Sequence, residues 1–214
     1  MITTKKDLIE YFETGIKNTH QFKIGVEHEK FIFDLDKNKR IDYKKILEMF
    51  EKLYEFGWKP ILEDENIVGL KKSGKSITLE PGNQIELSGG KLNNIHEACS
   101  ESQDYLFELK QVLKKLNLKI VSAGFDPISK LSAVPNNPKK RYSVMTKDMP
   151  EGGLLSLDMM YRTCGTQINL DYNSENDFIK KFKVINSIVP ISIALFANSS
   201  IVEKKNSHYL SYRS

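Results

Sequence analysis

The stretch IGVEHEKFIFD, residues 24–34, is typical of one long β-strand with two acidic side chains in its middle. In an extended chain, side chains two positions apart point to the same side, so Glu27 and Glu29 project together and His28 faces the other way. Two neighbouring carboxylates repel each other and resist burial unless a cation or water accompanies them. The pattern therefore indicates a metal ion, a basic partner or a strand face that is open to water.

A second segment, SITLEPGNQIELSGG, combines acidic residues with a strand pattern in the same way. Glu80 precedes a Pro-Gly break, and Glu86 lies between two aliphatic residues. A Pro-Gly pair interrupts or bends a strand, so alternation alone leaves open whether Glu80 and Glu86 share one face.

A third segment, RTCGTQINLDY, residues 162–172, alternates apolar and polar residues, which predicts a strand with one packed and one polar face. Gln167 and Asn169 fall on its polar side, where solvent exposure is the simplest reading of either residue alone. Three strands that each offer carboxylate or amide oxygens are better explained by one shared polar face. Hard cations such as Mg²⁺ are bound by such oxygens.

Composition limits the classes of protein to which the chain can belong. Its 214 residues are 40% hydrophobic, enough for a sizeable core, and the net charge of +4 comes from interspersed lysines without an arginine-rich stripe. Nucleic acid is therefore not an expected partner. The N-terminus is polar and no apolar run is long enough to span a bilayer, so the chain is expected to be cytoplasmic, without a membrane partner. Cys99 and Cys164 are expected to be free, packed thiols.

The order of patterns along the chain predicts an α+β fold, a mostly antiparallel sheet with helices packed on one side. Helices are expected over residues 4–17, 43–56 and 95–116, and from residue 174 onward with a kink or break at Pro190. A long ordered loop is expected over residues 126–155. The closing residues SHYLSYRS still alternate as a strand does, which predicts that the chain is a portion of a longer domain.

Six blocks of the sequence carry a resemblance to a known family, and they occur in the family order from about residue 22 to the end. The chain resembles the plant-type glutamate–cysteine ligases, which are also found in many proteobacteria and belong to the carboxylate–amine ligase group. The blocks are GVEHEKFIFD, TLEPGNQIELSG, RYSVM, LSLDMMYRTCGTQINLDY, FIKKFKVINSIVPISIALFANSS and LSYRS.

The resemblance implies a glutamine synthetase-like catalytic domain and a definite reaction. The γ-carboxylate of L-glutamate would be joined to the amine of L-cysteine through a γ-glutamyl phosphate, with ATP and Mg²⁺ required. This is the first step of glutathione biosynthesis, and its substrates are small molecules. By the same resemblance the metal ligands are Glu27, Glu29, Glu80, Glu86 and Gln167. Arg141 is implied as a catalytic and substrate-binding residue and Arg213 as a second substrate-binding residue, whereas Arg162 is expected to be structural.

Members of this family are considerably longer, so residues 1–214 are expected to be the N-terminal portion of a single catalytic domain, incomplete and inactive alone. Two alternatives stay open. The same fold could act as a γ-glutamyl ligase with another amine acceptor, ammonia included. The chain could instead be a non-catalytic module that binds glutamate or a nucleotide.

Overall fold

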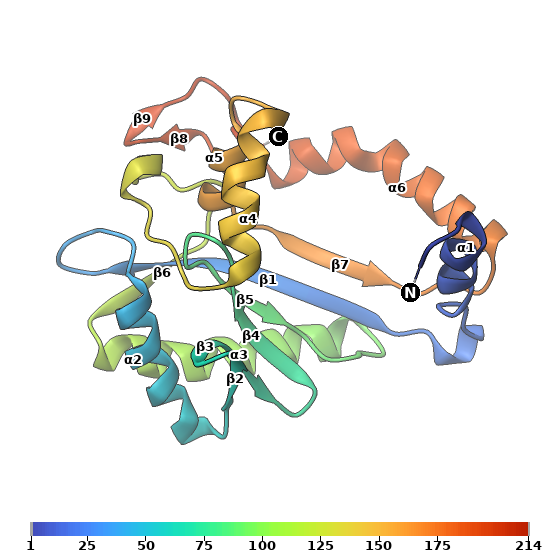
Figure 1. Cartoon of the computed structure of the whole chain (residues 1–214), viewed down its shortest axis with the longest axis horizontal. Helices are drawn as coiled ribbons and strands as arrows, with labels where there is room; N and C mark the ends of the chain where they lie inside the picture. The colour runs from blue at the N-terminus through green and yellow to red at the C-terminus, as the bar shows by residue number, and fades with distance from the viewer. Residues whose placement is uncertain (1, 214) are drawn as a thin grey trace.

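The computed structural model describes residues 2–213 as an α+β protein, which confirms the expected fold class (Figure 1). The helices are α1 (Lys5–Glu13), α2 (Tyr43–Leu53), α3 (Ile95–Lys115), α4 (Lys140–Asp148), α5 (Ser156–Arg162) and α6 (Glu175–Phe196). The strands are β1 (Ile24–Asp34), β2 (Lys59–Glu63), β3 (Asn66–Lys72), β4 (Lys75–Leu79), β5 (Ile85–Ser88), β6 (Leu118–Val121), β7 (Thr166–Leu170), β8 (Ile201–Val202) and β9 (Lys205–Asn206).

Strand β1, the stretch that carries the acidic pair, lies at the centre of the main sheet. The strand order is β2-β3-β4-β5-β1-β6, with β7 also paired to β1, and every pairing is antiparallel. One edge of β1 pairs with β5, while the other edge pairs first with β7 and then with β6. An eleven-residue strand is long enough to bring these three partners together.

Helices α2 and α3 cover one face of this sheet and form the main core with it. The buried side chains on α2 recur at helical spacing, as the sequence predicted, and so do those on α3. The strands contribute alternate residues to the same core. The fully buried members include Ile32, Ile46, Phe50, Leu70, Ile77, Leu79, Ile85, Leu87 and Leu109.

The ends of the predicted helices are set by local signals that the structure confirms. Thr4 and Asp7 form a capping box at the start of α1, and Asp42 caps α2 by accepting from the backbone N–H of Lys45. Gly57 follows the short turn of 3₁₀ helix after α2 with φ of 87°, a left-handed conformation that glycine adopts without steric cost.

Two segments differ from the sequence-based expectation. Residues 126–155 are not one loop, because they contain α4, which lies on the side of the sheet opposite α2 and α3 and donates a hydrogen bond from Tyr142 to Glu80. Residues 162–172 are not one strand: Arg162 ends α5, and β7 covers only the second half of the segment. Both helices are short, and neither has a side-chain cap that would mark its start in the sequence.

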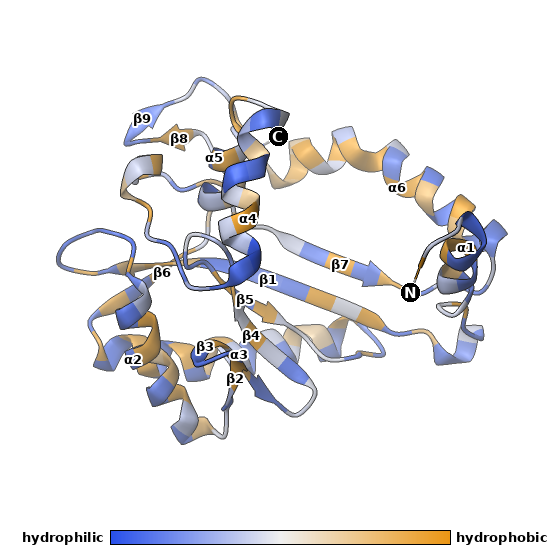
Figure 2. Ribbon diagram, in the orientation of Figure 1, coloured by the Kyte–Doolittle hydropathy of each residue, from blue (hydrophilic) through white to orange (hydrophobic). Residues whose placement is uncertain are grey.

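Helix α6 is apolar over most of its length (Figure 2). None of its residues is buried. Ser174 caps its start by accepting from the backbone N–H of Asp177, as the expected start at residue 174 requires, and the helix continues through Pro190 without the break that proline can cause. Many of its large apolar side chains are exposed, among them Phe182, Ile191, Leu195 and Phe196. Within residues 2–213, no helix combines the length and the hydropathy that crossing a membrane would require.

Candidate active site

The acidic residues of β1 and β5 lie on the sheet face opposite the main core. Glu29 is directly opposite Glu86 in the β1–β5 register, and Glu27 is directly opposite Gln167 in the β1–β7 register. Directly paired residues of an antiparallel sheet point to the same side. The alternation of β5 sends Ile85 and Leu87 into the core, so Glu86 must face outward. Strand parity thus brings these four side chains to one face, as the sequence predicted.

Each of these three acids uses one carboxylate oxygen for hydrogen bonds within the protein. Glu29 Oε2 accepts from the backbone N–H of Gly165 at 2.7 Å, and Glu86 Oε1 accepts from the Ser88 hydroxyl at 2.6 Å. Glu27 Oε1 accepts from the side-chain amides of Gln167 and Asn169 at 3.1 and 2.9 Å. Among the contacts described for residues 2–213, none engages the second oxygen of these acids. The protein therefore orients these carboxylates and leaves their second oxygens available to a ligand.

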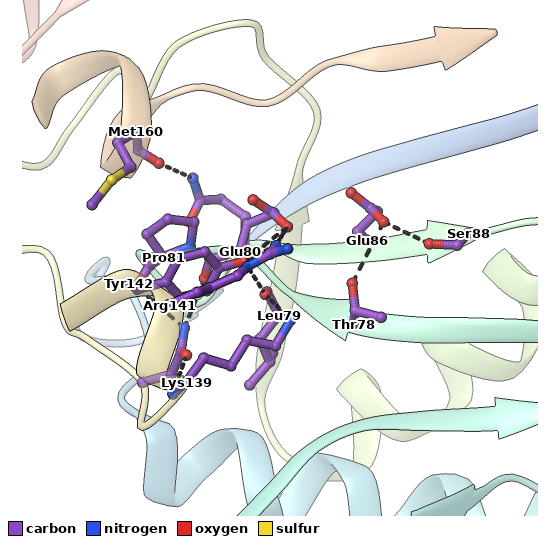
Figure 3. A network of polar contacts seen from close by, with 12 residues as sticks. Thr78, Leu79, Glu80, Pro81, Glu86, Ser88, Lys139, Arg141, Tyr142 and Met160 are labelled. Carbon is purple, nitrogen blue, oxygen red and sulfur yellow. Dashed lines mark hydrogen bonds and ion pairs between the residues drawn. The ribbon is translucent and has the colours of Figure 1, made fainter. Parts of the chain in front are cut away.

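Glu80 completes the acidic group from the turn that follows β4. Its Oε1 accepts from the Tyr142 hydroxyl at 3.0 Å and from Arg141 Nη2 at 3.3 Å, so α4 holds this carboxylate in place (Figure 3). The Arg141 guanidinium also lies over the Tyr142 ring, 4.6 Å from its centroid. Arg141 therefore lies next to the acidic group, on the side of Glu80 and Glu86.

Burial and mutual repulsion act together on these carboxylates. The pKa of Glu29 rises from its ordinary value of 4.5 to about 7, mainly because the side chain is desolvated, and the charges of Glu80 and Glu86 raise it further. The Gly165 hydrogen bond and the charge of Arg213 oppose that rise. The pKa of Glu80 is also raised, again first by desolvation and then by Glu86. A bound cation would favour the ionised form of both groups.

We expect the stability of the cation-free protein to fall as pH rises from about 4.5 to about 7. In that window folded Glu29 keeps a proton that the unfolded chain has lost, so the free energy of unfolding decreases with pH. Urea unfolding across pH 4 to 8 would measure the slope. Glu29→Gln should flatten the slope, and an unchanged slope in that variant would contradict the prediction. Glu65→Gln, at an exposed position, is the control.

Arg213 approaches the acidic group from the other end. It lines a hollow of about 340 Å³ together with Glu27, Glu29 and Gln167. A Cβ added to Gly165 would lie 2.9 Å from Arg213 Nη2 and 3.9 Å from Glu29 Oε2, so the missing side chain of Gly165 leaves room for the guanidinium next to the carboxylate. The two predicted arginines thus lie at different places, Arg141 beside Glu80 and Arg213 beside Glu29.

The donor set suits a hard divalent cation, although its geometry is open. Carboxylate oxygens and an amide on one polar face are the ligands that Mg²⁺ prefers. Within residues 2–213, no three His, Cys, Asp or Glu side chains lie close enough together to hold a metal ion as they stand. Glu27, Glu29, Glu86 and Gln167 share a face and Glu80 lies next to Glu86, but the role of all five as metal ligands stays a prediction.

The remaining sequence-based expectations have mixed outcomes. Arg162 is structural, as expected, but it is a buried helical residue that pairs with Asp158 at 2.7 Å and with Glu203 at 3.3 Å. Cys164 is a buried free thiol, as expected. Cys99 is free but exposed, so the expectation that it would be packed is wrong.

Sequence reasoning missed a buried polar network beside the acids. Arg40 donates to Asp126 Oδ2 at 3.0 Å and also to Gln84 Oε1, and all three side chains are almost fully inaccessible to solvent. Gln84 lies in the quoted block TLEPGNQIELSG, where an amide next to a Pro-Gly turn was a usable signal. Nothing in the sequence around Arg40 or Asp126 indicates that they meet, because 86 positions separate them.

A known protein family matches almost the whole chain. The model of glutamate–cysteine ligase family 2 matches residues 23–214, which include all the predicted ligands and both arginines. The chain belongs to this family. It is similar to glutamate–cysteine ligase of Nicotiana tabacum, with 43% identity over 212 residues, and to glutamate–cysteine ligase A of Oryza sativa subsp. japonica, with 44% identity over 212 residues. The Arabidopsis thaliana glutamate–cysteine ligase is 42% identical over the same length.

These similarities cover 99% of the chain but only 41% of the tobacco protein, 43% of the rice protein and 41% of the Arabidopsis protein. The chain thus spans about two fifths of the length of the curated family 2 ligases that it matches. The cytoplasmic location expected from the sequence is contradicted, because these relatives are named chloroplastic enzymes. A polar N-terminus was insufficient ground for that expectation.

Proposed function

We propose that this chain provides the acidic half of the active site of a glutamate–cysteine ligase. The reaction joins the γ-carboxylate of L-glutamate to the amine of L-cysteine at the expense of ATP, by way of a γ-glutamyl phosphate. The fold proposed for the complete catalytic domain is that of glutamine synthetase. Family membership supports the reaction class. Because the chain covers only about two fifths of its relatives' length, the activity of the whole protein is a proposal.

One observation carries the proposal: two acids from neighbouring strands, Glu29 and Glu86, are directly paired on a sheet face that also holds Glu27, Glu80 and Gln167. Uncompensated acids in this arrangement repel one another, which disfavours the folded state unless a cation relieves the repulsion. The reaction brings a nucleoside triphosphate close to a carboxylate substrate and therefore needs positive charge between them. Mg²⁺ bound by these oxygens would supply that charge.

The side chains of this chain then have separate roles. Glu27, Glu29, Glu80 and Glu86 would each present the oxygen that is not bound within the protein, with Gln167 at the edge of the set. Arg141 and Arg213 would bind carboxylate or phosphate oxygens at opposite ends of the acidic group. No side chain is needed as a nucleophile, because positioning and charge neutralisation account for such a transfer.

Replacing Arg141 or Arg213 by lysine is expected to weaken use of glutamate or of ATP in the full-length gene product while the fold is kept. Lysine keeps the charge but loses the planar fork that binds two oxygens at once, so kcat/KM should fall by roughly 10- to 100-fold, about 1.4 to 2.8 kcal/mol of transition-state stabilisation. Steady-state kinetics with each substrate varied in turn would measure this. Unchanged kinetics in both variants would show that Arg141 and Arg213 are ordinary surface residues.

The acceptor can be tested directly by offering cysteine, other amino acids and ammonia to the full-length gene product and measuring ADP release and product mass. A clear preference for cysteine supports the proposal, and equal use of another amine supports the alternative γ-glutamyl ligase. Calorimetric titration with MgATP separates both from a non-catalytic module that only binds glutamate. Absence of nucleotide binding would favour that module.

A further inference from the structure

We propose that Gln84 is a positioning residue that fixes the distance between Glu80 and Glu29, and thereby the spacing of the proposed cation ligands. The inference deepens the proposed function and rests on it for the cation site. Its structural part concerns two segments: the turn of residues 80–84, which carries Glu80, and the segment of residues 160–165, which supplies the hydrogen bond to Glu29.

The amide oxygen of Gln84 holds the turn together from within. Gln84 Oε1 accepts from the backbone N–H of Gly82 at 2.8 Å, and the Glu80 N–H donates to the Gln84 carbonyl oxygen, also at 2.8 Å. Arg40 donates to the same Oε1 and to the Gly82 carbonyl oxygen. The side-chain amide of Gln84 therefore acts together with Arg40 and the backbone hydrogen bonds to set the geometry of the turn from which Glu80 projects.

The amide nitrogen of Gln84 reaches the second segment. Nε2 donates to the Thr163 carbonyl oxygen at 3.0 Å and to the Met160 carbonyl oxygen at 3.4 Å. Two positions beyond Thr163, the N–H of Gly165 donates to Glu29 Oε2 at 2.7 Å. Gln84 thus joins, by hydrogen bonds, the turn that carries Glu80 to the backbone that orients Glu29.

The two segments that Gln84 joins are closely packed. A Cβ added to Gly82 would lie 2.6 Å from the Tyr161 carbonyl oxygen, so the turn and the second segment are already in close contact. Gln84 is 1% exposed, and water cannot readily replace its hydrogen bonds. Only an amide has an acceptor for the Gly82 and Arg40 donors together with N–H groups for the two carbonyl oxygens.

The same turn provides a matched control. Asn83 is also 1% exposed, and its side-chain amide donates to the Ile41 carbonyl oxygen at 3.1 Å, away from residues 160–165. Gln84→Glu and Asn83→Asp both convert a buried amide of this turn into an acid. Gln84→Met removes the hydrogen bonds without adding charge. Weaker cation binding in this variant would therefore not come from a new charge near the site.

The test compares backbone hydrogen exchange of the four proteins, wild type included, as the full 214-residue chain without metal. Mass spectrometry of a peptide that covers residues 160–168 reports on the Gly165 N–H. Both Gln84 variants should exchange there about tenfold faster or more, since a buried carbonyl oxygen without a donor favours local opening. Asn83→Asp should leave this peptide unchanged. Equal exchange in the Gln84 and Asn83 variants would overturn the proposal.

A second measurement separates this inference from the proposed function. Mn²⁺ binding, followed by electron paramagnetic resonance, should weaken about 10- to 100-fold in Gln84→Met relative to wild type and stay unchanged in Asn83→Asp. If wild type binds no Mn²⁺ but exchange at residues 160–168 rises only in the Gln84 variants, the positioning role stands and the cation site fails. If wild type and Gln84→Met bind Mn²⁺ equally, the positioning role is wrong.

Discussion

Glu86→Gln is expected to lower ligase turnover of the full-length gene product by at least about 100-fold while making the cation-free fold slightly more stable. The substitution keeps the size of the side chain and removes the charge directly opposite Glu29, so repulsion decreases as a proposed cation ligand is lost. Parallel measurements of kcat and of the free energy of unfolding without Mg²⁺ would show the two effects with opposite sign.

Glu65→Gln is the matched control, because Glu65 is an exposed acid outside the acidic group. It should change neither quantity appreciably. A Glu86→Gln variant that keeps full turnover would remove Glu86 from the active site. A variant that loses turnover and stability together would instead indicate that Glu86 supports the fold. Its carboxylate accepts hydrogen bonds from the hydroxyls of Ser88 and Thr78 at 2.6 and 3.4 Å.

The 214-residue chain, expressed as it stands, is expected to self-associate through α6. Large apolar residues along this helix are exposed, with Ile191 at 61% and Leu195 at 73%, and contiguous apolar surface of this kind favours association in water. Replacing Ile191 and Leu195 together by lysine should shift the chain toward the monomer of 24.6 kDa. Size-exclusion chromatography with light scattering would measure the mass.

Val144→Lys is the control for this experiment, because Val144 is 66% exposed but lies on α4, away from α6. It should leave the distribution of masses unchanged. A wild-type chain that is monomeric over a wide range of concentration would contradict the prediction.

The fold class and the acidic face were predictable because both depend on local periodicity. Alternation in residues 24–34 identifies β1, and side chains at i and i+2 must share a face whatever the strand pairs with. Glu86 joins them because it lies between two aliphatic residues that the core requires. Helices α2 and α3 were predictable for the corresponding reason, since their apolar residues follow the helical period.

The parts that could not be predicted depend on contacts between distant positions. Helix α5 consists of seven residues without a side-chain cap, and its apolar residues fit a strand as well as a helix. Arg162 was therefore assigned to the wrong element. Arg40 and Asp126 form a buried ion pair whose members carry no local signal. Exposure of Cys99 on α3 likewise depends on which side of the helix the sheet covers.

The hydrogen bonds that hold one oxygen of each acid have a consequence for the entropy of ligand binding. A free glutamate side chain loses up to about 2 kcal/mol of rotamer freedom when it is fixed in one conformation. In Glu29, Glu80 and Glu86 that loss has already occurred on folding, through Gly165, Tyr142 and Ser88 respectively. A cation at the proposed site would therefore meet side chains with less rotamer freedom left to lose than free glutamate side chains have.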